Sequence, residues 1–283
     1  MWTALRRSVT YVKRLVTWAW VMNSLRGLTA EDQKSLNASC RAAFGNSAHN
    51  LDIWCDPILL EGLTAKVKGI GVFRLRPQSD DLFHVLPYRE LRVFEALRQH
   101  LHPGDVFVDA GANIGIFTVA AARCVGPTGR IIAVEMMPDT AEILRETLTL
   151  NDVGNALVIE RALAARAGAR VEATVRDGHF GQATIALGAT QAGGRQVQVE
   201  TTTLKDLLAD YPTVALMKMD IEGAELDALR GAGSDLQKVN VILFEILDDN
   251  SKVPDYLNSM GFDISKLDSR NRIAFNRQAG TSR

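Results

Sequence analysis

The chain has 283 residues, of which 47% are hydrophobic and 23% charged, so it has the composition of an ordinary globular protein with a large core. This composition excludes a largely disordered chain, a collagen-like chain and a coiled coil. The formal net charge of −1 gives no indication of nucleic-acid binding. The charges are unevenly placed, however, because residues 1–30 contain five basic residues and no acidic one. The three cysteines are widely spaced, so neither a disulfide framework nor a zinc site is predicted, and a reducing, cytoplasmic compartment is expected.

Residues 1–28 are predicted to form an amphipathic helix. One face carries apolar residues at steps of three and four: Trp2, Leu5, Val9, Val12, Val16 and Ala19. The other face carries Arg6, Thr10, Lys13, Arg14 and Thr17. The uncharged run over 15–25 is too short and too polar to span a bilayer. Three roles stay open for this helix: docking on the rest of the chain, a partner or a second copy; peripheral contact with an anionic membrane surface; or targeting.

The chain is expected to have three parts. Residues 1–50 form the helical appendage, which includes a second short helix after position 29. Residues 51–100 form a lead-in hairpin and a helix over 88–100. Residues 101–283 alternate strand and helix, which predicts an α/β domain with a Rossmann-like, mostly parallel sheet and an antiparallel pair of strands at its C-terminal end. The expected main strands are Asp105–Asp109, Arg130–Glu135, Ala156–Glu160, Val214–Asp220 and Val239–Ile246.

A glycine-rich turn follows the first of these strands. It reads Asp109-Ala110-Gly111-Ala112-Asn113-Ile114-Gly115 and lacks the G-x-G-x-x-G spacing of a dinucleotide site. Glycines between a strand and a helix let backbone N–H groups approach a ligand closely. The carboxylate that opens the turn would repel a pyrophosphate but suits a ligand that carries an ammonium group. The alternative is a tight turn that binds nothing.

Glu135 ends the next strand, about 20 residues after the glycines, where nucleoside sites place the acid that binds the ribose. Its two oxygens can accept hydrogen bonds from both ribose hydroxyls. A solvated acid at a strand end is the alternative. A nucleoside with a sulfonium and an amino-acid tail, S-adenosylmethionine, satisfies both carboxylates.

Three blocks of sequence resemble the signature blocks of one enzyme family. Two shorter segments match the same family: the lead-in to the fourth strand (201–208) and the FEI at 244–246. The three blocks are GDVFVDAGANIGIFT (104–118), RIIAVE (130–135) and KMDIEGAEL (218–226). They resemble the signature blocks of the FkbM-type S-adenosylmethionine-dependent methyltransferases, over about residues 85–265.

The resemblance implies O-methylation of a hydroxyl on a sugar, a glycan or glycolipid, or a secondary metabolite. By analogy, the cofactor would be held by Asp109, Gly111, Ala112, Asn113, Gly115, Glu135, Met136, Ala162, Leu163 and Asp220. Asp109 and the backbone of the turn would hold the methionine part, Glu135 the ribose, and Ala162 and Leu163 would flank the adenine.

The segment Lys218-Met219-Asp220-Ile221-Glu222 carries the candidate catalytic residues. In a strand, Lys218 and Asp220 point to the same face, and Asp220 sits where the strand ends. A hydroxyl acceptor benefits from a base that removes its proton as the new bond forms. Asp220 is the first choice and Glu222 the second, with Lys218 beside them. The alternative is that these acids cap a helix and that Lys218 only neutralises Asp220.

Weaker signals concern the acceptor. His179 lies in the uncharged stretch 178–194, a candidate loop on the acceptor side, and Glu245 ends the fifth strand; an inert histidine and a solvated acid are the alternatives. No sequence pattern demands a divalent metal. Two other functions stay open, a nicotinamide-dependent oxidoreductase on a similar sheet and a non-catalytic scaffold that binds the cofactor.

Overall fold

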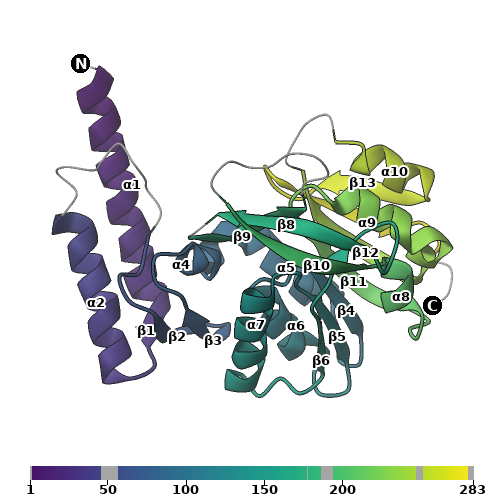
Figure 1. Ribbon diagram of the computed structural model, residues 1–283, viewed down its shortest axis with the longest axis horizontal. Coiled ribbons are helices and arrows are strands. Elements are labelled where there is room, and N and C mark those ends of the chain that lie inside the picture. The colour runs from purple at the N-terminus through teal and green to yellow at the C-terminus, as the bar shows by residue number, and fades with distance from the viewer. Residues whose placement is uncertain (1, 46–56, 177, 186–193, 247–250, 280–283) are drawn as a thin grey trace. The chain divides into compact units, whose positions relative to one another are not determined.

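The structure is a computed structural model that describes residues 2–45, 57–176, 178–185, 194–246 and 251–279 (Figure 1). The chain divides into two compact units. Unit 1 comprises Met1–Glu90 together with Asp177–Gly181, and unit 2 comprises Leu91–Arg176 and Gln182–Arg283.

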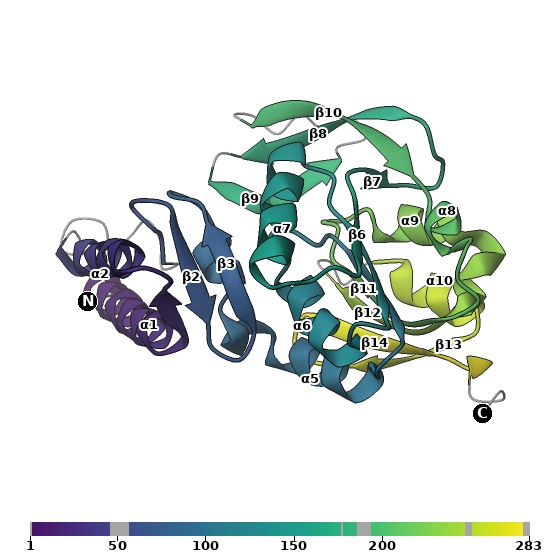
Figure 2. The ribbon, with the colours of Figure 1, turned by 90° about the horizontal axis from the view of Figure 1, so that it is seen from below.

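Unit 1 begins with two helices, α1 (Trp2–Ser24) and α2 (Ala30–Gly45), which lie side by side in Figures 1 and 2. The predicted helix over 1–28 is confirmed, but it ends at Ser24 because the next residues pair antiparallel with β2 as a short strand. The three-stranded sheet has the order β1-β2-β3, which confirms the predicted hairpin. Its strands are β1 (Leu25–Gly27), β2 (Leu63–Val67) and β3 (Gly71–Leu75), followed by α4 (Asp81–His84) and the 3₁₀ helix η1 (Pro87–Glu90).

The buried face of α1 differs from the sequence prediction. Trp18 and Val21 are buried, and so is Arg14, which the helical pattern places on the polar face. Arg14 is buried with a partner, since its Nη1 donates a hydrogen bond to the carbonyl of Ala43 at the end of α2 (3.3 Å). Burial of a guanidinium is tolerable when its donors find acceptors.

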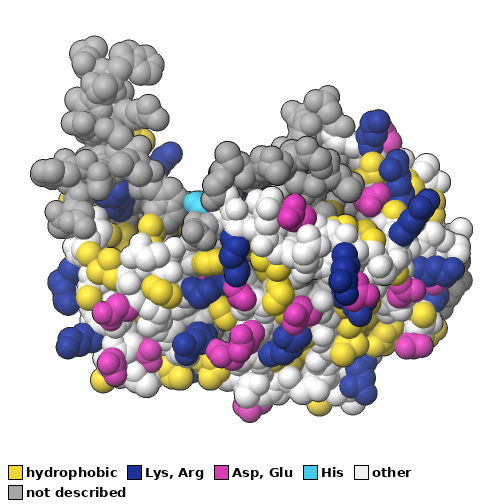
Figure 3. Space-filling view, viewed as in Figure 1, with side chains coloured by type: hydrophobic (Ala, Val, Ile, Leu, Met, Phe, Trp, Pro, Cys, Tyr) yellow, Lys and Arg dark blue, Asp and Glu magenta, His cyan; other side chains and the backbone are white. Residues whose placement is uncertain are grey.

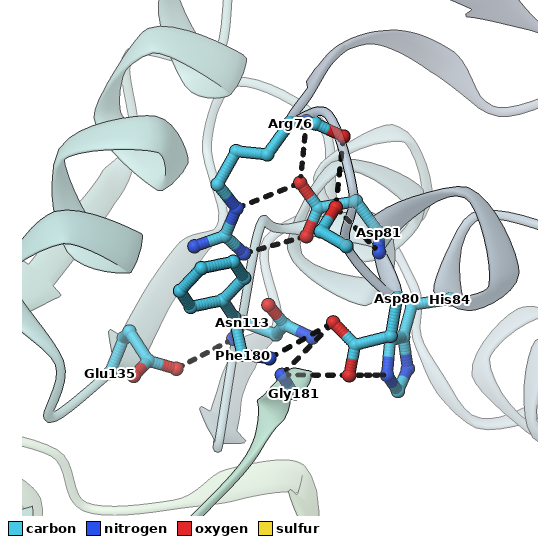
Figure 4. Close-up of polar contacts among 9 residues, drawn as sticks. Arg76, Asp80, Asp81, His84, Asn113, Glu135, Phe180 and Gly181 are labelled. Carbon is cyan, nitrogen blue, oxygen red and sulfur yellow. Dashed lines mark hydrogen bonds and ion pairs between the residues drawn. The ribbon is translucent and has the colours of Figure 1, made fainter. Parts of the chain in front are cut away.

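Two adjacent acids organise the polar interior of unit 1 (Figure 4). Asp81 accepts from Nε and Nη2 of Arg76, at 2.9 and 2.6 Å. Asp80 accepts from the backbone N–H groups of Phe180 and Gly181, at 3.1 and 3.2 Å, and lies 3.3 Å from Nε2 of His84. Asp80 thereby fixes a segment that is a hundred residues away in the sequence.

Unit 2 is built on a seven-stranded sheet of order β13-β14-β12-β11-β4-β5-β6. The five strands from β12 to β6 are parallel, and β14 and β13 are antiparallel, as the sequence predicts. The strands are β4 (Val106–Ala110), β5 (Arg130–Val134), β6 (Ala156–Ile159), β11 (Val214–Met219), β12 (Val239–Glu245), β13 (Phe262–Lys266) and β14 (Asn271–Asn276).

Helices cover both faces of this sheet: α5, α6 and α7 on one, α8, α9 and α10 on the other (Figures 1 and 2). Alternate residues of the central strands, such as Val108 and Met217, face the α8–α10 side and form a continuous apolar core with it. The helices are α5 (Leu91–His100), α6 (Ile116–Val125), α7 (Pro138–Leu150), α8 (Leu204–Leu208), α9 (Glu225–Ala232) and α10 (Val253–Ser259), with a 3₁₀ helix η2 (Gly233–Lys238) after α9.

A second sheet of four strands has the order β7-β10-β8-β9. Strands β8 (Arg170–Arg176) and β10 (Arg195–Thr202) are antiparallel, and β7 (Ala162–Leu163) and β9 (His179–Ile185) complete the sheet. Strand β9 starts in unit 1 and continues in unit 2.

Candidate functional site

The candidate site lies at the carboxyl ends of β4, β5 and β11. The chain runs outward from β4 to β5 and β6 and later returns to the other side of β4 with β11. This reversal makes the β4–β11 boundary the topological switch point, where open parallel sheets bind their ligands. The residues singled out from the sequence at the ends of β4, β5 and β11 therefore meet at one edge of the sheet.

The glycine-rich turn after β4 passes very close to the turn after β11. Gly111 has φ +82°, and a Cβ on it would lie 1.9 Å from the carbonyl oxygen of Asp220. Gly115 also has positive φ, and a Cβ there would lie 2.7 Å from Leu144. Asn113 between them is left-handed at φ +50°, an uncommon conformation for a residue with a side chain. Glycine at 111 and 115 thus allows the tight turn and its packing.

Asp109 is fully buried near the end of β4, at 0% exposure. Its Oδ2 accepts a short hydrogen bond, 2.6 Å, from the hydroxyl of Thr118 on α6, and its Oδ1 has no hydrogen-bond partner among the described residues. Burial raises the pKa of the Asp109 carboxyl, while the charge of Lys218 and the Thr118 hydrogen bond oppose this effect. An unsatisfied buried carboxylate oxygen is costly and marks a place where a donor belongs.

Glu135 follows β5 and is also buried. Oε2 accepts from the backbone N–H of Asn113 (3.0 Å, Figure 4), and Oε1 accepts from the N–H of Met137 (2.9 Å). The carboxylate thus ties the glycine-rich turn to the start of α7. A carboxylate oxygen can accept more than one hydrogen bond, so Glu135 keeps capacity for ribose hydroxyls.

Lys218 and Asp220 form an ion pair at the end of β11, with Nζ 3.2 Å from Oδ2. Lys218 is buried, and its Nζ lies 4.7 Å from the centre of the Phe117 ring, within the range of a cation–π contact. The Asp220 side chain is partly exposed, so it is the accessible member of the pair. An accessible carboxylate held beside a buried cation can receive a proton from a bound molecule.

The turn after Asp220 is held by an acid that the sequence interpretation did not select. Glu225, at the start of α9, is buried and accepts from the N–H groups of Ile221 (3.1 Å) and Gly223 (3.3 Å) through Oε1. Glu222 lies between them at φ +52°, and its carbonyl accepts from the Thr184 hydroxyl (3.2 Å). An acid in the first turn of a helix usually caps that helix. The sequence alone therefore does not indicate that Glu225 shapes the turn after Asp220.

The remaining predicted residues are more dispersed. Ala112 is buried in the turn and Met136 is half-buried beside Glu135. Ala162 and Leu163 are buried in β7, whose backbone pairs with β10. Glu245 ends β12 in an ion pair with Arg270. His179 is half-buried at the start of β9, in unit 1, and positions 186–193 of the predicted acceptor loop lie outside the described residues.

The described part of the chain contains neither a metal-binding cluster nor a helix that could span a membrane. In these residues, no group of three or more His, Cys, Asp or Glu side chains is arranged to hold a metal ion. None of the helices in the described ranges is both long and apolar enough to cross a membrane.

The model of the methyltransferase FkbM domain matches residues 109–264, which includes the glycine-rich turn, Glu135, and the whole Lys218–Glu225 segment. Methyltransferase 1 of Beauveria bassiana is 29% identical, over 58% of this chain and 74% of that protein. The hexuronic acid methyltransferase AglP of Haloferax volcanii is 27% identical, over 65% of this chain and 74% of AglP.

Among solved structures, the methyltransferase FkbM from Methylobacillus flagellatus is 18% identical with a TM-score of 0.42, over 69% of this chain and 53% of that chain. The family model spans more than half of the sequence. The chain belongs to the FkbM methyltransferase family.

Proposed function

We propose that this methyltransferase uses S-adenosylmethionine as its methyl donor and methylates a hydroxyl oxygen of a sugar, a glycan or glycolipid, or a secondary metabolite. The observation that carries the proposal is the pair of buried carboxylates, Asp109 and Glu135, at the ends of adjacent parallel strands on either side of a left-handed, glycine-rich turn. A cationic nucleoside with an amino-acid tail could place its ammonium group against one of these carboxylates and its ribose hydroxyls against the other.

The chemistry of the residues fits that cofactor. The unsatisfied Oδ1 of Asp109 and the unsatisfied Oδ1 of Asn113 are both buried acceptors at the turn, suited to the ammonium group of the methionine part. Glu135 would accept hydrogen bonds from the ribose hydroxyls while it keeps its backbone partners. Ala162 and Leu163 stay candidates for the adenine pocket.

For the transfer itself, the cofactor supplies a methyl group activated by a positively charged sulfur, so the protein has to align the acceptor and take up its proton. Asp220 would accept the hydroxyl proton as the carbon–oxygen bond forms and the carbon–sulfur bond breaks. Lys218 holds the Asp220 carboxylate in place through their 3.2 Å ion pair. Glu222, on the strained turn beside Asp220, is the second candidate base.

Binding of the cofactor is tested by calorimetry with S-adenosylmethionine and with NADH as the competing cofactor class. We expect binding of the first only. Glu135→Gln should weaken binding about 10–100-fold, because hydrogen bonds to a charged acceptor are lost. Glu142→Gln, an exposed acid on α7, is the matched control and should bind like the wild type. Equal binding by both variants would contradict the assigned role of Glu135.

The acceptor is tested with methyl-labelled S-adenosylmethionine and paired glycosides. Because the relative AglP is a hexuronic acid methyltransferase, hexuronic acid glycosides are the first probe, with the neutral hexose glycosides as matched acceptors. We expect label in a glycoside and a methyl ether in its NMR spectrum. Asp220→Asn should lower kcat by about 10²–10⁴-fold while calorimetric binding of the cofactor stays intact. Cofactor binding without transfer to any acceptor would favour a scaffold role.

A further inference from the structure

Helix α1 presents a continuous apolar surface to solvent. The exposed fractions are 56% for Val12, 51% for Val16 and 45% for Trp20. At 100° per residue these side chains fall on one arc of the helix, together with other exposed residues. We define the α1 stripe as Val9, Val12, Leu15, Val16, Ala19 and Trp20.

The stripe is not the packing face of the helix, because a different arc holds α1 in unit 1. Trp18 and Val21 are buried, and Arg14 reaches the end of α2 through its hydrogen bond to Ala43. The Tyr11 ring meets Phe44 edge to face at 6.4 Å, also on the α2 side. The helix is therefore held mainly by the α2 side, while the stripe extends along the opposite side. At the end of the stripe the Trp20 ring also lies 5.1 Å from the Tyr88 ring of η1, and it stays 45% exposed.

The charge of this region favours an anionic partner. Residues 1–30 carry five basic residues and no acidic residue; of these, Arg14 is buried, whereas Lys13 and Arg26 are exposed. Lys13 is exposed and borders the stripe on the helix. On the face shown in Figure 3, by contrast, acidic and basic side chains are interspersed. A basic helix with Trp and aliphatic side chains on its exposed face is the pattern of helices that lie in a membrane interface.

The size of the stripe argues against a dimer formed through it. The stripe is a single row of side chains on one helix, far fewer than the roughly 20–30 residues that each partner contributes to a standard protein interface. A contiguous exposed apolar strip is nevertheless a feature that marks interaction sites on soluble proteins, unlike apolar residues scattered singly. Immersion of a single helix face needs only such a strip, because the acyl chains and headgroups close around it.

From these observations we propose that the α1 stripe docks peripherally, in the plane of the membrane, on an anionic lipid surface. The apolar side chains would enter the acyl boundary and Lys13 would contact the lipid phosphates. Docking would be reversible, because one helix with few basic charges and no lipid chain gives modest affinity. This inference is independent of the cofactor and of the acceptor.

Vesicle flotation of the full chain tests the proposal. Vesicles of phosphatidylcholine alone are compared with vesicles that contain phosphatidylglycerol, at low and high salt. We expect flotation with the anionic vesicles and at least about tenfold less with neutral vesicles or at high salt, since surface charge is screened by ions. Trp20 fluorescence should shift to the blue on binding, and this shift should be lost in Trp20→Phe.

Paired variants separate the stripe from general apolar exposure. Val12→Asp with Val16→Asp should reduce flotation at least about tenfold, because charges are placed in the apolar strip. Leu91→Asp, an exposed leucine at the start of α5, is the control and should float like the wild type. Circular dichroism and unfolding curves verify that each variant is folded.

Three outcomes would overturn the proposal. The first is that the wild type fails to float with anionic vesicles. The second is that the double variant floats like the wild type. The third is that sedimentation shows a dimer that the double variant converts to a monomer, without flotation of the wild type, which would assign the stripe to a second copy of the chain.

Discussion

Lys218 and Asp109 are register partners on the adjacent parallel strands β11 and β4, so their side chains leave the sheet on the same face. The Lys218 charge counteracts the burial that raises the pKa of the Asp109 carboxyl. The same ammonium group pairs with Asp220. The buried Lys218 ammonium thus interacts with two acids: Asp109, which we assign to the cofactor, and Asp220, which we assign to the acceptor.

Replacement of Lys218 by methionine should affect both acids. Without the cation, the pKa of Asp109 rises further and Asp220 loses its partner. We expect cofactor binding about tenfold weaker and kcat lowered about 10²-fold or more. Calorimetry and steady-state rates measure the two effects, and Lys205→Met, an exposed lysine on α8, is the control. Wild-type rates in Lys218→Met would refute the shared role.

The pH dependence of stability should report Asp109. Because its folded pKa is raised, the native state keeps a proton that the unfolded state loses above about pH 3.8. Stability therefore falls as pH rises from there through the folded pKa, by at most about 1.4 kcal/mol per pH unit. Asp109→Asn cannot titrate, so its stability relative to the wild type should increase over that window. Urea unfolding from pH 4 to 8 measures this difference, and a flat difference would contradict the prediction.

Gly111→Ala should disrupt the site and the fold. The new Cβ would meet the Asp220 carbonyl oxygen at 1.9 Å, and alanine is strained at φ +82°. We expect a loss of about 3 kcal/mol or more in the free energy of unfolding, or an insoluble protein. Gly154→Ala is the matched control, because nothing lies within 4 Å of its Cβ. The control should unfold within about 0.5 kcal/mol of the wild type.

Glu225 should act as a positioning residue. Glu225→Ala leaves the N–H groups of Ile221 and Gly223 without their acceptor and should cost about 1–3 kcal/mol of stability. Since these groups shape the turn after Asp220, kcat should fall more than cofactor affinity does. Glu225→Gln keeps one acceptor oxygen and should recover most of kcat. Wild-type kcat in Glu225→Ala would show that Glu225 has no part in positioning the turn.

Asp80 should matter for unit 1 in a pH-dependent manner. Burial raises its pKa, but the hydrogen bond and charge of His84 and the backbone N–H of Gly181 outweigh this effect, so the pKa is lowered overall. Its stabilising contribution is therefore present above about pH 3.8 and is lost as pH falls through the folded pKa. Asp80→Asn should destabilise the protein by about 1–3 kcal/mol at pH 7. The difference should shrink in acid, with the exposed Asp210→Asn as control.

Much of unit 2 could be predicted from the sequence, because its buried parallel strands and its helices have clear and distinct hydrophobic patterns. Helix α7 spans Pro138–Leu150, since proline suits a helix start and Asn151 ends it. Strand β7 has only two residues, Ala162 and Leu163, and is held by pairing with β10. Such a strand has no period of its own and is not detectable from sequence.

The candidate site was partly predictable for a similar reason. Asp109, Glu135 and Asp220 could be located because strand ends place them at one edge of the sheet. The contacts around these acids could not be predicted, because they depend on the tertiary structure. Examples are the hydrogen bond from the Thr118 hydroxyl, the left-handed φ of Glu222 and the hydrogen bonds that Glu225 accepts. The buried Arg14 illustrates the same limit, since its acceptor lies on another helix.

The position of strand β9 limits how the N-terminal part of this protein can be removed or transferred to another protein. The chain passes between the units at Glu90 and again on both sides of Asp177–Gly181. Deletion of residues 1–90 would remove Asp80 and leave the N–H groups of Phe180 and Gly181 without their carboxylate acceptor. The N-terminal part is therefore not an interchangeable module, and a graft onto another methyltransferase would have to carry the tip of β9 with it.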